Sequence, residues 1–205
     1  MEMRESNYEI MKHRMQEEFA SYDLDQVASE WELKQDDQYL YVDFVAKKYR
    51  IDRRSGAVLC GMEGKQEADY NVSMTLFDIL TRKRQHASGK VLPISSFSTV
   101  QSATMSGGSM FDSVSRRFDG HDEELAAACE QLGGKPYGKG DAAYIFPVFR
   151  DLQAALQFWD SDEDFPPALN LFCDKNILSF MHFETVMFML IHVIEQLEDE
   201  LQKKL

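Results

Sequence analysis

The stretch that decides the fold runs from Leu152 to Asp174 and reads LQAALQFWDSDEDFPPALNLFCD. Its first eight residues place apolar side chains at every second position, which is the period of a half-buried β-strand. Residues 169–173 predict a further strand, and the polar, proline-containing residues 160–167 predict the turn between the two. Strands joined by so short a turn pair antiparallel, because a parallel return needs a crossover of about a dozen residues or more.

The N-terminal half predicts a second antiparallel unit. Residues 39–44 alternate in the same way, and residues 49–51 repeat the alternation before the turn at 52–56, so residues 39–60 predict a meander of short strands. Helical spacing marks several further segments. These segments are a stripe formed by Tyr8, Met11, Met15, Phe19 and Tyr22, a helix over 24–31 capped by Asp23, a helix capped by Asn71, and a long helix over 184–205. We therefore predict a single α+β domain over residues 1–205, in which helices pack on one side of antiparallel strands.

Charge and cysteine usage narrow the class of protein. The 205 residues carry 35 acids against 22 Lys and Arg, a net charge of −13 that repels nucleic-acid backbones and anionic membrane surfaces. The three cysteines are widely spaced and form no zinc or iron–sulfur pattern. The charged N-terminus lacks the apolar core of a secretory signal, and no apolar run approaches the roughly 20 residues of a membrane span. We expect a cytoplasmic protein with reduced thiols, without nucleic-acid or membrane partners.

The densest candidate site is the acidic turn itself. Its candidate metal- or partner-binding residues are Asp160, Asp162, Glu163 and Asp164, with Asp174 one strand further on. Asp160, Asp162 and Asp164 match the first ligand positions of a calcium loop, but Phe165 stands where that loop needs glycine and Leu171 where it needs a bidentate Glu. A solvated acidic turn is the leading interpretation. A weak divalent-cation site and a general acid–base pair of two carboxylates are the alternatives, and no cofactor is otherwise indicated.

Basic residues gather in two places. The first group is a candidate anion-binding hairpin formed by Lys47, Lys48, Arg50, Arg53 and Arg54, and the second runs from Arg82 to Lys90. In an acidic protein such groups could hold an anionic ligand or an acidic partner, although solvated faces are the simpler interpretation. Two histidines also stand out. His182 precedes the last helix and His192 lies among Met, Leu, Ile and Val, where a structural histidine is favoured over a catalytic base.

The last third of the chain resembles an uncharacterised bacterial and archaeal family, domain of unknown function 3786. The matching elements are Pro147, Trp159, the turn Asp162–Pro166, the strand end Leu171–Asp174, and the helix start Met181–Glu184. Cys173 is inserted in the strand end, and His182 stands where the family has proline. The resemblance implies no reaction. Some relatives carry a cysteine-rich iron–sulfur segment, whose cysteines this chain lacks.

Two functional hypotheses follow. The first is a non-catalytic binding or accessory module that contacts a protein partner through the exposed acidic turn. The second is a metal-assisted hydrolase or other small-molecule enzyme that uses Asp162, Glu163, Asp164 and Asp174, together with Asp141 or His182. The second hypothesis requires those carboxylates to converge. The sequence indicates neither the partner nor the oligomeric state.

Overall fold

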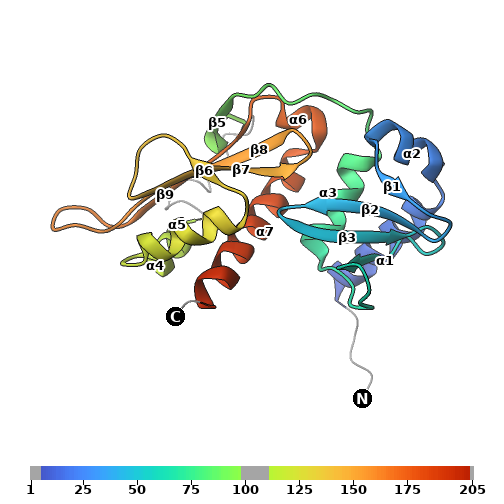
Figure 1. The fold of residues 1–205 in the computed structure, drawn as a ribbon, viewed down its shortest axis with the longest axis horizontal. Helices are drawn as coiled ribbons and strands as arrows, with labels where there is room; N and C mark the ends of the chain where they lie inside the picture. Colours follow the sequence, from blue (N-terminus) through green and yellow to red (C-terminus); the bar gives the residue numbers. More distant parts are fainter. Residues whose placement is uncertain (1–5, 98–110, 204–205) are drawn as a thin grey trace, which may run out of the picture. The chain divides into compact units, whose positions relative to one another are not determined.

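The computed structural model describes residues 6–97 and 111–203 and has an α+β fold with antiparallel sheets (Figure 1). Its elements in chain order are α1 (Asn7–Ala20), α2 (Leu24–Trp31), β1 (Lys34–Gln35), β2 (Tyr39–Phe44), β3 (Lys47–Asp52), β4 (Val58–Cys60), α3 (Tyr70–Leu80), β5 (Val91–Pro93), the 3-10 helix η1 (Ile94–Phe97), α4 (Asp112–Phe118), α5 (Asp122–Gln131), β6 (Lys135–Pro136), β7 (Ala142–Phe149), β8 (Leu152–Trp159), β9 (Ala168–Asp174), α6 (Ile177–Phe180) and α7 (Phe183–Gln202).

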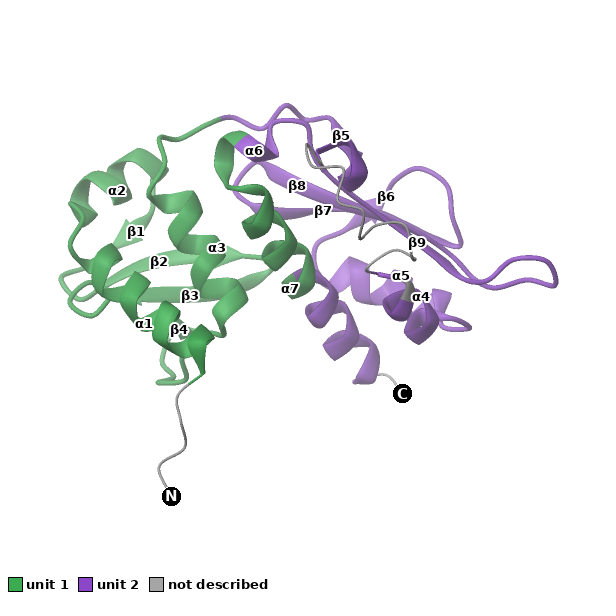
Figure 2. Ribbon diagram, turned by 180° about the vertical axis from the view of Figure 1, so that it is seen from behind, with its two compact units in different colours: residues 1–85, 179–192 green, residues 86–178, 193–205 purple. Residues whose placement is uncertain are grey.

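The chain divides into two compact units (Figure 2). Unit 1 comprises residues 1–85 and 179–192, and unit 2 comprises residues 86–178 and 193–205. Helix α7 is continuous and contributes its first half to unit 1 and its second half to unit 2. The expectation of one domain over 1–205 stays a prediction.

Unit 1 contains the predicted meander. Its sheet has the order β1-β2-β3-β4, with antiparallel pairing throughout. The alternation along β2 buries Leu40, Val42 and Phe44, as expected for a sheet with one face in the core. Helix α2 begins at the predicted cap, because the Asp23 carboxylate accepts a hydrogen bond from the Gln26 N–H at 3.0 Å. The indole of Trp31, at the end of α2, is almost fully buried.

Helix α1 is present as predicted, but of the predicted stripe only Phe19 is buried, and two polar side chains are buried with it. Tyr8 and Met11 are 66% and 42% exposed, whereas Lys12, Gln16 and Phe19 are buried. The two polar side chains share one carboxylate, and Lys12 Nζ also lies 3.1 Å from Glu9 Oε2. Lys12 Nζ lies 3.4 Å from Glu67 Oε2, and Gln16 Nε2 donates to the same oxygen at 3.1 Å. Polar side chains can be buried when they form hydrogen bonds or ion pairs. A prediction based on the spacing of apolar residues does not detect such pairs.

Helix α3 corrects one predicted cap. The N-cap is Asp69 and not Asn71, because the Asp69 side chain accepts from the Val72 N–H at 2.9 Å and Tyr70 is already helical. Asp and Asn are about equally good caps, so the choice between them depends on where the preceding chain enters the helix. The predicted apolar face of α3, with Leu76 and Ile79, is buried.

Unit 2 contains the sheet that positions the acidic turn. Its strand order is β5-β9-β8-β7-β6, and all pairs are antiparallel. Strands β8 and β9 pair from Trp159 with Ala168 to Ala154 with Cys173, so residues 160–167 form their connecting turn as predicted. Pro147 lies beside a register shift in β7, where β6 no longer pairs with that strand. Helices α4 and α5 pack on this sheet, and Phe118 meets Phe158 edge to face at 6.1 Å.

No helix within the described residues combines the length and the apolar character that crossing a lipid bilayer requires.

Candidate functional site

The acidic turn is tied to two other loops of unit 2. Asp160 Oδ1 accepts from the Gly120 N–H at 2.9 Å, and the Asp160 N–H donates to Asp141 Oδ2 at 2.8 Å. The N–H and hydroxyl of Ser161 both donate to the Asp119 carboxylate, at 2.8 and 3.0 Å. The α4–α5 junction and the β6–β7 turn therefore meet the start of the acidic turn, and each contributes a carboxylate.

These loops enclose an open groove of about 810 Å³. Four carboxylates line it, from Asp122, Asp141, Asp160 and Asp162, together with the rings of Trp159 and Phe165. The Phe165 ring is 70% exposed, an unusual state for a large apolar side chain. We call this set of six residues the acidic groove.

The groove is electronegative. Partial burial raises the pKa of Asp160, the Gly120 N–H opposes this effect, and the neighbouring carboxylates of Asp122, Asp119 and Asp141 raise the pKa further. Within the described part of the chain, neither Asp119 nor any of the four groove carboxylates lies within ion-pair distance of a Lys or Arg side chain. Their mutual repulsion is therefore relieved by backbone and hydroxyl donors and by water, and an incoming cation would relieve it further.

The other acidic candidates lie apart from the groove wall. Glu163 and Asp164 point into solvent on the same turn, where Asp162 Oδ1 accepts the N–H groups of Asp164 and Phe165 at 2.8 Å each. Asp174 lies at the far end of β9, roughly 20 Å along the strand by its rise per residue. Its carboxylate is fully buried and accepts from Ser88, Gly89 and Asn176. The structure therefore does not bring Asp174 together with the acidic turn.

The turn carboxylates also lack a metal-binding arrangement. Among the residues that the structure describes, the carboxylate oxygens of Asp160, Asp162, Glu163 and Asp164 do not gather in threes within 4.8 Å of one another. Hard cations such as Ca²⁺ need six to eight oxygens that converge on one point. The convergence that the enzyme hypothesis requires is absent from the turn in this structure.

The five basic candidates spread along β3. Lys47 and Lys48 begin the strand, and Arg53 and Arg54 follow its end, roughly 17 Å away by the rise per residue. Arg50, between them, is buried. Its guanidinium donates to the carbonyls of Met62 and Gly64 and lies 4.9 Å from the centre of the Tyr39 ring.

Two other members of this group are paired. Lys48 lies 3.5 Å from Asp43, and Arg53 lies 2.8 Å from Asp25. The structure therefore does not bring the five cations together around one anion.

His182 is exposed and is held by two charged side chains of unit 1. Its Nδ1 lies 3.0 Å from both oxygens of Asp78 and 2.7 Å from Arg82 Nη2. Its backbone N–H also donates to Asp78 Oδ2 at 2.7 Å. Because the carboxylate of Asp78, a residue of α3, binds the backbone of the residue that precedes α7, the contact explains how α7 begins there and gives His182 a structural role.

Some residues in or beside the acidic groove could not be selected from the sequence as a site. Asp119 and Asp122 precede the turn by about 40 residues, and Trp159 and Phe165 resemble ordinary apolar positions. The Asp119–Gly120 pair between two predicted helices is the only local signal, since Gly120 has a φ of +75°, which suits a helix end. That signal indicates a turn and not a site.

Fold and groove together define an α+β protein with an acidic, aromatic-lined surface groove. Its sequence matches the family described as Domain of unknown function (DUF3786) over residues 23–196, and the chain belongs to that family. The resemblance in the last third of the sequence is thereby confirmed. Neither the curated proteins nor the solved structures contain a significant match to this chain.

Proposed function

We propose that this protein is a non-catalytic binding module that takes up a Lys- or Arg-rich segment of a partner protein in the acidic groove. The observation that carries the proposal is the gathering of four carboxylates and two aromatic rings around one open groove. Among residues 6–97 and 111–203, no Lys or Arg side chain forms an ion pair with these four carboxylates. Such a surface lowers the energy of an incoming positive charge.

The composition of the groove favours a peptide-like cation over a bare metal ion. An ammonium or guanidinium group can contact one carboxylate at a time while its alkyl stem covers an aromatic ring. A cation over the face of Trp or Phe gains further electrostatic attraction, about 0.5–1 kcal/mol at exposed sites. Trp159 and Phe165 provide those faces. The net charge of −13 also steers a basic partner toward the protein from a distance.

The cytoplasm is the compartment that we assign to this interaction. The thiols of Cys60, Cys129 and Cys173 are all unpaired, and burial raises the pKa of Cys129 and Cys173 to about 12. Neutral, unreactive thiols inside a core suit a reducing compartment.

The proposal is tested with a short peptide that alternates Lys and Arg with Gly, titrated into the full chain while tryptophan fluorescence is recorded. Trp159 lines the groove, so binding is expected to change its emission, whereas Trp31 is buried in unit 1. Affinity is expected to fall as salt is added, because exposed charges are screened. The same peptide with Glu in place of every Lys and Arg is expected not to bind.

Two charge-matched variants locate the binding site. The triple variant Asp141→Asn, Asp160→Asn and Asp162→Asn keeps a side-chain oxygen for each turn hydrogen bond and is expected to weaken binding by at least about tenfold, near 0.5 kcal/mol per charge. The control Glu17→Gln, Asp37→Asn and Glu63→Gln removes the same charge from exposed positions of unit 1. Equal losses in both variants, or no binding of the basic peptide to the unmodified protein, would contradict the proposal.

A further inference from the structure

The carboxylates of the acidic groove are held in fixed orientations by the protein backbone. One oxygen of Asp160 accepts the Gly120 N–H at 2.9 Å, and one oxygen of Asp141 accepts the Asp160 N–H at 2.8 Å. One oxygen of Asp162 accepts two N–H groups of its own turn at 2.8 Å each. The second oxygen of each of these three carboxylates forms no hydrogen bond with the part of the chain that the structure describes. Each therefore presents an oriented acceptor to a ligand.

These acceptors are spread along the groove. Among the described residues, no three of the four groove carboxylates bring an oxygen within 4.8 Å of one another. Acceptors spread in this way suit a donor group that is itself extended. A guanidinium carries five N–H donors around the edge of a rigid plane, whereas an ammonium presents its three donors from a single atom.

Two aromatic rings add a second feature of the same kind. Trp159 and Phe165 line the groove together with the carboxylates, and the Phe165 ring is 70% exposed. A planar guanidinium stacks on an aromatic face while its edge forms hydrogen bonds. It is also more weakly hydrated than an ammonium, so less water has to be removed when it contacts a ring. The rings therefore favour arginine over lysine as well.

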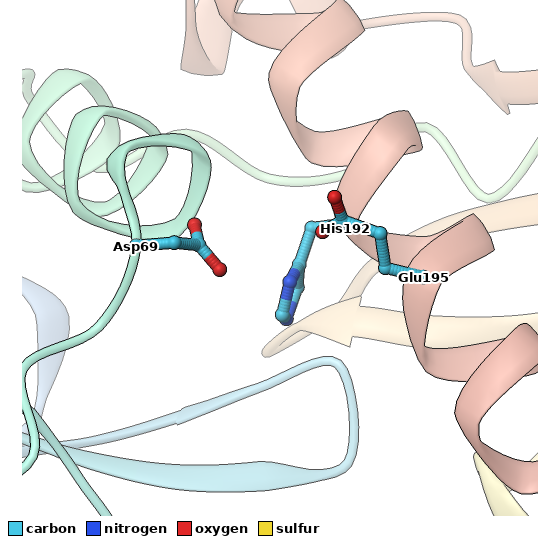
Figure 3. A group of neighbouring side chains, drawn as sticks. All are labelled: Asp69, His192 and Glu195. Carbon is cyan, nitrogen blue, oxygen red and sulfur yellow. The ribbon is translucent and has the colours of Figure 1, made fainter. Parts of the chain in front are cut away.

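Unit 1 contains an internal example of such a combination. The buried ring of His192 stacks on Phe44, with centres 5.6 Å apart and planes 8° from parallel, and its Nε2 lies 3.2 Å from the Tyr49 hydroxyl. A carboxylate oxygen of Asp69 lies within 4.8 Å of a ring nitrogen of His192, and Figure 3 shows this carboxylate pointing toward the imidazole. A planar nitrogen-containing group is thus accommodated beside an aromatic face and a carboxylate. The groove of unit 2 offers the same two kinds of group to a ligand.

We infer that the acidic groove selects arginine over lysine and that its partner is an Arg-rich protein segment. The inference rests on the proposed function, because it requires that a basic segment binds in this groove. The oriented carboxylate oxygens accept the N–H edge of the guanidinium, and Trp159 or Phe165 covers its face. A lysine gains the same attraction between charges, but neither the extended set of hydrogen bonds nor the stacking.

The test compares three peptides that alternate one basic residue with Gly and differ only in that residue, which is Arg, Lys or dimethylated Arg. Each is titrated into the full chain at one salt concentration while tryptophan fluorescence is recorded. The Arg peptide is expected to bind at least about fivefold more tightly than the Lys peptide. Methylation keeps the charge of Arg but blocks its bidentate hydrogen bonding, so the dimethylated peptide is expected to bind no more tightly than the Lys peptide.

Two variants examine the two features separately. Asp160→Glu keeps the charge but displaces the carboxylate by one methylene, so it is expected to reduce the preference for Arg while the affinity for the Lys peptide is unchanged. Phe165→Leu is expected to weaken binding of the Arg peptide by about two- to fivefold. The matched controls are Asp164→Glu, on the same turn but outside the groove wall, and Phe183→Leu, at an exposed ring of unit 1. Both controls are expected to keep the full preference for Arg.

The outcomes separate this inference from the proposed function. If the Lys peptide binds as tightly as the Arg peptide, or if dimethylation leaves the affinity of the Arg peptide unchanged, selection of arginine is overturned, although a basic segment still binds. If none of the three peptides binds, the proposed function is contradicted and this inference with it.

Discussion

Asp174→Ala is expected to lower the free energy of unfolding by about 4 kcal/mol, because it leaves several buried donors without an acceptor. The Asp174 side chain is fully buried. Oδ1 accepts the N–H groups of Ser88 and Asn176 at 3.0 and 2.7 Å, and Oδ2 accepts the Gly89 N–H at 3.0 Å and the Ser88 hydroxyl at 3.1 Å. One carboxylate thus fastens the segment that enters β5 to the end of β9. Urea denaturation of the purified variant measures the loss.

Asp162→Ala is the matched control for that substitution. Asp162 also accepts two backbone N–H groups, from Asp164 and Phe165, but on a turn that is open to solvent. Water can replace its oxygen there, so the expected loss is below about 1 kcal/mol. If both variants lost the same small amount of unfolding free energy, the structural role of Asp174 would be refuted. A binding role for Asp174 would then be favoured again.

Asp78→Ala is expected to lower the free energy of unfolding by about 2–3 kcal/mol, because Asp78 anchors the start of α7 from helix α3. Its carboxylate is 14% exposed and accepts from the His182 N–H at 2.7 Å and from Arg82 Nε at 3.0 Å. Burial alone would raise the pKa of Asp78. The hydrogen bonds from the His182 backbone and from the side chains of Thr185, Arg82 and His182 outweigh that effect and lower the pKa below its ordinary value of 3.8.

The pH dependence of this loss follows from the lowered pKa. A carboxyl whose pKa is lower in the folded state contributes its full stabilisation above the unfolded value of 3.8 and loses it as the pH falls through the lower folded value. The difference between the unmodified protein and Asp78→Ala is therefore expected to be largest near neutral pH and to shrink in strong acid. Denaturation curves at about pH 7 and about pH 3 measure it.

Asp43→Ala is the control for Asp78. Asp43 pairs with Lys48 at 3.5 Å, but the Asp43 side chain is 79% exposed. A surface ion pair of this kind contributes about 0–1 kcal/mol. A loss at Asp78 no larger than at Asp43, or one that does not change between neutral and acid pH, would contradict the anchoring role.

Strand periodicity made the β8–β9 hairpin predictable. Alternation along residues 152–158 identifies the buried face, and the turn length between the strands dictates antiparallel pairing. The Asp23 cap was predictable for a similar reason, because capping acts within three residues. The Asp69 cap was missed because Asn71 offers the same chemistry two positions later. The buried face of α1 was missed in part because the buried Lys12 and Gln16 both contact Glu67, more than 50 residues away.

The candidate site was predictable only in its local part. The acidic turn follows from residues 160–167 alone, and Asp162, Glu163 and Asp164 are exposed, whereas Asp160 is partly buried. Asp174 is a neighbour of the turn in sequence, but a full strand separates the two in space. The candidate anion-binding residues are likewise separated in space. Lys47 and Lys48 lie at the start of β3, Arg53 and Arg54 follow its end, and Arg50 between them is buried.

The sequence by itself determined the α+β class, the hairpin that carries the acidic turn, and the negative field around the chain, because periodicity, turn chemistry and charge act over a few residues or add up over all of them. Only the tertiary structure decided that Asp119, Asp122 and Asp141 stand around Asp160, and that Asp69 and Tyr49 meet His192. Those contacts join residues 19 to 143 positions apart in the sequence. They form only when the complete sheets and helices pack, so no local sequence pattern predicts them.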